Sequence, residues 1–338
     1  MKKSKFYLIS LVFLTLLILG GCGLFNKAPD KSPEEVLKDG FKNLSALNSG
    51  SMQVVLNVSG SGVEQGKQQQ IAMNVNMGGN FDSKDKQNPK GDFVLSGDVT
   101  YDNAKYDGQI DLKIIGKKLY FNLVKYPDLS KDNSQLAMLS LFANKWFFAD
   151  MSQYGYGDVS ILSFDESSLT PEQKEIKDEF GKTNFLKDLK YEGIEDVGNV
   201  SAYKYTGTFD KDNFYNFVLK ASEINKSAST DENKANFKKA LDSLNASPME
   251  VFVSVDGEVF VGAKGFFDYS DPVQNASFNV KFDLKFTNIN QPVAVETPKD
   301  AVDIMQAFGA QLGGMTPSLP NKSDLTDMEQ KVPVDKDK

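Results

Sequence analysis

The stretch that decides the fold runs from Ser51 to Met77 and reads SMQVVLNVSGSGVEQGKQQQIAMNVNM. Apolar side chains occupy every second position in both of its halves, first at Met52, Val54, Leu56 and Val58 and then at Ile71, Met73, Val75 and Met77. A period of two is typical of β-strands that have one apolar face and one wet face. The glycine-rich polar residues between the halves predict that the two strands form an antiparallel hairpin.

The same alternation continues along the chain and predicts a larger antiparallel sheet. Further strands are expected over residues 93–101, 110–114, 119–123, 249–255, 258–269 and 277–289. Asp102-Asn103 and Asp256-Gly257 lie between alternating runs, where a tight hairpin needs residues that tolerate positive φ. Only short connections separate consecutive strands, which is typical of an antiparallel meander.

Helical patterns interrupt the strands. Capping boxes at Ser32–Glu35 and Thr170–Gln173 each place Pro at the first helical position. The first box predicts an amphipathic helix over residues 33–47, and helices are also expected over 171–180, from Asp210 onward, over 232–244 and over 299–312. A sheet with one apolar face needs a covering layer, and these helices can supply it. The prediction is an α+β fold over residues 32–313. It has a single curved antiparallel sheet, an incomplete β-barrel, with helices packed on its concave face.

The N-terminus has the features of a bacterial lipoprotein leader. Three lysines precede an apolar run from Phe6 to Leu19, and the chain's one cysteine, Cys22, directly follows Leu19-Gly20-Gly21. This pattern predicts a signal peptide over residues 1–21, lipidation of Cys22 and a tether over residues 22–31. The alternatives are an ordinary cysteine after a generic signal peptide, or an uncleaved anchor. At the other end, the polar and proline-containing residues 314–338 predict a disordered tail.

Composition excludes several classes of function. The chain contains no His and no Arg, and its net charge is −8. Without His, a Ser-His-Asp triad and the usual zinc sites cannot form. An acidic chain without Arg is unsuited to nucleic acids. Its attachment to a membrane must therefore depend on acyl chains rather than on a basic patch.

Motifs for catalysis, metals and cofactors are incomplete. Gly62 to Lys67 is one residue too short for a P-loop, and Ser83-Lys84-Asp85-Lys86 lacks the companion motifs of penicillin-binding enzymes. Both fit turns or solvated loops. We therefore expect a protein that is not an enzyme, with no catalytic residue, metal or cofactor.

Aromatic residues are the notable feature, with 25 Phe and 12 Tyr against a single Trp. Trp146 and Phe148 fall on one face of a strand and Phe147 on the other. Most such residues fill cores. A cavity beneath the curved sheet is the functional alternative, and its predicted lining includes Phe121, Trp146, Phe148 and Phe266.

The layout resembles the lipoprotein-carrier superfamily, which includes the Lol carrier and receptor proteins and the LppX-type lipid-binding lipoproteins. The resemblance covers roughly residues 33–308. It is carried by the lipobox-like leader, by the helix at 37–47 leading into the strand at 52–58, and by Ala202–Asp210 leading into a helix. It implies a half-barrel that shelters acyl chains between sheet and helices. The soluble carrier of that superfamily holds its cargo with an Arg, which this chain lacks, so a receptor, local acceptor or structural role is implied instead.

Three functions stay open at this point. The first is a lipoprotein anchored through Cys22 to the extracytoplasmic face of the cell membrane, with a lipid or acyl chain as ligand. The second is a structural or protein-interaction surface lipoprotein with a filled core and no ligand. The third is a hydrolase whose clustered ionisable groups occupy a cleft. The ligand's identity, the protein partners and the oligomeric state are not indicated by the sequence.

Overall fold

The computed structural model describes residues 28–64, 67–101, 104–127, 142–154, 169–226, 230–271 and 275–311. The predicted signal peptide, Cys22, most of the predicted tether and the predicted tail lie outside these ranges. None of the helices within them is long and apolar enough to cross a membrane.

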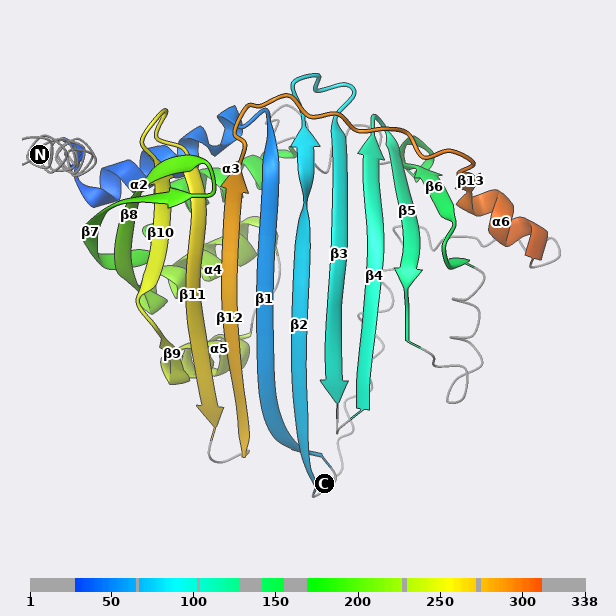
Figure 1. The fold of residues 1–338 in the computed structure, drawn as a ribbon. Helices are drawn as coiled ribbons and strands as arrows, with labels where there is room; N and C mark the ends of the chain where they lie inside the picture. The colour runs from blue at the N-terminus through cyan, green and yellow to red at the C-terminus, as the bar shows by residue number, and fades with distance from the viewer. Residues whose placement is uncertain are drawn as a thin grey trace, which may run out of the picture.

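The core of the fold is one 13-stranded sheet, curved and not closed into a barrel (Figure 1). The strand order is β13-β6-β5-β4-β3-β2-β1-β12-β11-β10-β8-β7, and β9 pairs with β11 beside this path. Its strands are β1 (Ser49–Glu64), β2 (Lys67–Asp82), β3 (Lys90–Tyr101), β4 (Ala104–Ile115), β5 (Lys118–Lys125), β6 (Trp146–Asp150), β7 (Leu186–Val197), β8 (Val200–Phe209), β9 (Leu244–Ala246), β10 (Met249–Ser254), β11 (Phe260–Asp271), β12 (Ala276–Thr287) and β13 (Val302–Asp303).

The predicted antiparallel sheet and its hairpins are confirmed by the register. β1 pairs with β2 from Ser49–Asp82 down to Glu64–Lys67, so these two strands form the predicted antiparallel hairpin. Apolar residues form rows across the strands; one row joins Leu284, Val54, Met77, Leu95 and Ile110. We call the face that carries this row the inner face and the opposite one the outer face.

Most helices pack on the inner face, over the part of the sheet formed by β7 to β12 (Figure 1). They are α2 (Pro33–Lys42) with the 3-10 turn η2 (Asn43–Ala46), α3 (Pro171–Lys182), α4 (Lys211–Ile224) and α5 (Asp231–Ser243). A second 3-10 turn, η4 (Met151–Tyr154), follows β6. The largest buried cluster lies between α2 and the sheet. It includes Val36 and Leu37 of α2 and, from the sheet, Val253 and Phe260. The predicted layer of helices is thus present.

The expected helix over residues 299–312 is wrong in its start and in its place. Residues 288–301 instead cross the ends of the strands to the far edge of the sheet, where β13 pairs parallel with β6 (Figure 1). Asp300 has a φ of 56°, which is incompatible with a helix, and Asp303 Oδ1 accepts the backbone N–H of Met305 at 2.8 Å. Helix α6 (Ile304–Gln311) therefore begins later and lies beside β6 rather than over the inner face.

Strand β7 has no counterpart among the strands expected from the sequence. Its register with β8 shifts twice, between Lys187 and Lys190 and again between Tyr191 and Gly193. Each bulge inserts a residue and moves the following side chains to the other face. This interruption removes the regular alternation by which the other strands could be predicted.

Candidate functional site

Helix α2 is fixed to the sheet by its sequence. The Ser32 side chain accepts the Glu35 N–H, and the Glu35 carboxylate accepts the Ser32 N–H at 2.9 Å, so the predicted capping box is confirmed. Val36 is fully buried, and Gly40 allows the closest approach: a Cβ there would lie 3.2 Å from the Val253 methyl groups. The helix therefore rests directly on β10.

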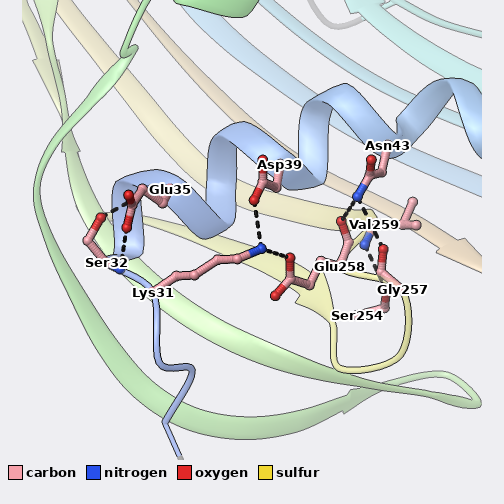
Figure 2. A network of polar contacts seen from close by, with 9 residues as sticks. All are labelled: Lys31, Ser32, Glu35, Asp39, Asn43, Ser254, Gly257, Glu258 and Val259. Atoms are coloured by element: carbon pink, nitrogen blue, oxygen red, sulfur yellow. Dashed lines mark hydrogen bonds and ion pairs between the residues drawn. The ribbon is translucent and has the colours of Figure 1, made fainter.

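A polar network attaches one side of α2 to the loop between β10 and β11 (Figure 2). Lys31 Nζ donates to Asp39 at 2.8 Å and also pairs with Glu258. Farther along the helix, Asn43 Nδ2 donates to the Gly257 and Glu258 carbonyls at 3.3 and 3.2 Å. Lys31, the last residue of the predicted tether, thus takes part in holding the helix.

The ionisation of this network is biased towards the charged forms. The hydrogen bond from Lys31 lowers the pKa of Asp39, and hydrogen bonds to Asp39 and Glu258 raise the pKa of Lys31. A backbone hydrogen bond from Ser32 lowers the pKa of Glu35. A lowered carboxyl pKa stabilises the fold above the unfolded pKa and loses that effect as the pH falls through the folded pKa.

This bias gives a pH prediction for the Asp39→Asn variant. At pH 7 the variant is expected to melt slightly below the native chain, because the Lys31 pair is solvent-exposed and of small effect. The gap should begin to narrow below about pH 4, the ordinary pKa of an unfolded aspartate, and should keep narrowing as the pH falls through the lowered pKa of folded Asp39. Melting curves from pH 3 to 8 check this; a gap that stays constant across the range would contradict it.

The other side of α2 forms one wall of an apolar cleft, which we call the α2–α3 cleft. It is partly enclosed, has a volume of about 220 Å³, and lies between α2, the end of α3 and the inner face of β7, β8, β10 and β11. Its lining consists of Glu34, Leu37, Lys38, Phe41, Phe180, Gly181, Thr183, Asn184, Phe185, Leu186, Leu189, Phe209, Met249, Val251, Phe260 and Ala263.

Aromatic rings shape this cleft. Phe41 of α2 stacks on Phe260 of β11 with ring centroids 4.7 Å apart, and it forms a T-shaped contact with Phe180 of α3 with centroids 6.1 Å apart. Phe180 also contacts Phe185 at 4.9 Å and Phe217 of α4 at 5.8 Å. α3 has no buried residue of its own. Contacts between aromatic rings therefore connect α2 to α3 along one side of the cleft.

The lining of the cleft is mostly apolar, with few charged groups. Its charged lining residues, Glu34 and Lys38, are exposed and lie one helical turn apart on α2. Within the described ranges, no group of three or more His, Cys, Asp or Glu residues could hold a metal ion. A few polar groups beside a mostly apolar wall are the usual make-up of a site for an apolar ligand.

The structure places none of the four sequence-predicted cavity residues in this cleft. Phe121 pairs with Phe147 on the inner face but near the other edge of the sheet. Trp146 and Phe148 alternate with Phe147 and so point to the outer face, where Lys113 and Lys118 lie over their rings. Ala263 of β11 lines the cleft on the inner face. Phe266 lies three positions farther along the same regular strand, so its side chain points to the outer face as well. The four side chains are therefore not brought together.

Sequence reasoning missed the segment that completes the cleft. Phe180 to Leu189 links the end of α3 to β7, and β7 was not expected. The available signal was the Thr170 capping box, which is confirmed and which starts the helix that ends beside Phe180. Only the pairing of β7 with β8 brings this segment opposite α2.

A second hollow, on the outer face, is polar. It is lined by Glu192, Gly193, Ile194, Glu195, Lys204, Thr206 and Glu250. Lys204 pairs with Glu195 at 3.0 Å and with Glu250 at 3.1 Å, and Lys264 pairs with Glu250 at 2.8 Å. These charges satisfy one another, so the α2–α3 cleft is the better candidate site.

No described protein family and no curated protein sequence matches the chain. Similar solved structures include the lipoprotein LppX of Mycobacterium tuberculosis, with 13% identity and a TM-score of 0.29 over 79% of this chain and 100% of LppX. Another is a DUF1329 family protein from Desulfovibrio piger, with 10% identity and a TM-score of 0.18 over 78% of this chain and 96% of that one.

Proposed function

We propose that this protein is a lipoprotein, anchored through Cys22 to the extracytoplasmic face of a membrane, that binds an acyl chain in the α2–α3 cleft. We propose further that it binds without catalysing a reaction. The observation that carries the proposal is the apolar cleft between the sheet and the helices, lined by aromatic and aliphatic side chains.

The size of the cleft suits part of an acyl chain. An apolar cavity of about 150 Å³ in a protein core stays dry and admits benzene. The α2–α3 cleft, at about 220 Å³, is larger than that and is open on one side. A segment of acyl chain can therefore lie inside while the rest of the ligand leaves through the opening.

The position of the cleft suits a ligand that comes from a membrane. Cys22 and Lys31 are separated by nine residue steps, and an extended chain covers about 3.4 Å per step, or roughly 30 Å in all. Lys31 is held to Asp39 and Glu258, and Glu34 and Lys38 of the same helix line the cleft. A lipid anchor on Cys22 would thus keep Lys31, at the start of the helix that lines the cleft, within about 30 Å of the bilayer.

Filling the cleft tests the proposal. The mature chain with Cys22→Ser is titrated with a polyene fatty acid that fluoresces when sheltered from water. Ala263→Trp places a large ring in the cleft and is expected to weaken binding at least about tenfold, which corresponds to about 1.4 kcal/mol. The matched control, Ala240→Trp, puts the same ring on the exposed surface of α5 and should bind like the parent. The proposal fails if the parent does not bind or if both variants bind equally.

A protein-interaction role is the second candidate, and one surface feature favours it. Tyr269, Phe278, Gly60, Ile71 and Tyr101 form one row across β11, β12, β1, β2 and β3. Phe278, Ile71 and Tyr101 are 40%, 44% and 43% exposed, a combination that is typical of contact surfaces. If the cleft binds no acyl chain, this role takes first place.

A further inference from the structure

The exposed lining residues of the α2–α3 cleft mark where it opens to solvent. Of the residues that line it, Glu34, Lys38, Phe180, Gly181 and Asn184 are exposed, and the others are half-buried or buried. The opening therefore lies between the first two turns of α2 and the connection from α3 to β7. A ligand whose acyl chain occupies the apolar interior has its polar end at this opening, beside these exposed residues.

The charged groups at the opening both belong to α2. Glu34 and Lys38 are four positions apart in the helix, so their Cβ atoms lie on one side of it, about 5–6 Å apart. Neither side chain has an ion-pair partner among the residues that the structure describes. Asp39, the acid next to Lys38 in sequence, accepts a hydrogen bond from Lys31 instead. A carboxylate and an ammonium are thus both available to a ligand at the opening.

Two opposite charges at one opening favour a headgroup that carries both charges. A ligand with a single negative charge is attracted by Lys38 but repelled by Glu34, and a neutral ligand pairs with neither. A phosphoethanolamine group carries a phosphate and an ammonium joined by an ethylene link, so both of its charges can be paired at once. Lysine is a common phosphate ligand with three N–H donors, and a carboxylate accepts hydrogen bonds from an ammonium.

We propose that Glu34 and Lys38 form a headgroup subsite at the opening of the α2–α3 cleft that selects a zwitterionic phospholipid, with the phosphate beside Lys38 and the ammonium beside Glu34. This inference rests on the proposed function and narrows it, because it names the class of acyl ligand. Both side chains are exposed, so each pairing is partly solvated and its effect on affinity is moderate. The other exposed lining residues carry no charge, so α2 sets the headgroup preference.

Ligands with the same lauroyl chain separate the headgroup from the cleft itself. Lysophosphatidylethanolamine, lysophosphatidylglycerol and the monoglyceride monolaurin are each titrated, below the micelle concentration, into the mature chain with Cys22→Ser, and calorimetry measures the affinity. The zwitterionic ligand is expected to bind about fivefold more tightly than the other two. Lys38→Gln should weaken both phospholipids by about threefold to fivefold and leave monolaurin unchanged. Glu34→Gln should weaken the zwitterionic ligand by a similar factor and strengthen the anionic one, because the repelling carboxylate is gone.

Helix α5 supplies the matched controls. Glu232 occupies the second position of its helix, as Glu34 does in α2, and both Glu232 and Lys239 are exposed and do not line the cleft. Glu232→Gln and Lys239→Gln repeat the changes in charge away from the opening and should alter none of the affinities.

The outcomes distinguish the subsite from the cleft. Equal affinity of the parent for the three ligands, tighter binding of lysophosphatidylglycerol, or an unchanged preference in both α2 variants overturns the headgroup subsite and leaves the cleft standing. Failure of the parent to bind any of the three ligands overturns the subsite and the proposed function together.

Discussion

Gly79→Ala is expected to destabilise the protein by at least about 2 kcal/mol, because the added methyl group has no space. A Cβ at Gly79 would overlap the Asp92 carbonyl oxygen on β3 and lie 2.6 Å from Phe93 Cδ1 and 2.7 Å from Phe93 Cα. Two of these neighbours are backbone atoms, so relief requires β2 and β3 to separate. Phe93 is itself a buried core residue, and its displacement adds to the loss. Urea unfolding of the mature chain with Cys22→Ser measures the change.

The adjacent glycine provides the matched control. Gly78 pairs with Val94 on the same two strands, and a Cβ there would meet no atom within 4 Å. Gly78→Ala is therefore expected to be neutral or to stabilise by about 0.5 kcal/mol, since alanine restricts the unfolded chain more than glycine does. Similar losses in the free energy of unfolding for the two variants would contradict the close approach of β2 and β3 at Gly79.

Cys22→Ser is expected to remove the protein from the membrane fraction. The thiol of Cys22 is the only one in the chain, and serine cannot be lipidated in its place. A diacyl anchor buries many methylene groups, each contributing about 0.8 kcal/mol, so its loss has an all-or-none effect on partitioning. Fractionation of cells followed by immunoblotting measures the distribution, and intact-mass analysis reads the acyl chains on the mature N-terminus.

Asn26→Ser is the control for this experiment, since it introduces the same residue four positions along the predicted tether. It should stay in the membrane fraction with an acylated Cys22. If the Cys22→Ser protein still pellets and retains its leader, the apolar run from Phe6 to Leu19 is an uncleaved anchor instead of a signal peptide.

Local patterns in the sequence predicted most of the elements. Alternation located the long strands, and the capping boxes at Ser32 and Thr170 placed two helix starts correctly. Such signals succeed because they depend on neighbours within a few residues, whose geometry the backbone fixes. The same reasoning failed at Thr297, where a suitable capping sequence precedes a turn at Asp300 and the short strand β13, which pairs with the far edge strand β6. There the tertiary connection outweighed the local preference.

The candidate site depended on long-range packing. Trp146 and Phe148 attract notice in the sequence, yet alternation around the buried Phe147 directs them away from the helices. The cleft instead joins α2 to a segment near Phe185 that lies more than a hundred residues away in sequence.

The sequence by itself thus determined the class of fold, the start of α2 and the prediction of a lipid anchor on Cys22, because each depends on a pattern in contiguous residues. Only the tertiary structure decided which aromatic residues surround a cleft. The physical reason is that bulges in β7 set which of its side chains face the helices, and the pairing of distant strands sets which of those side chains meet.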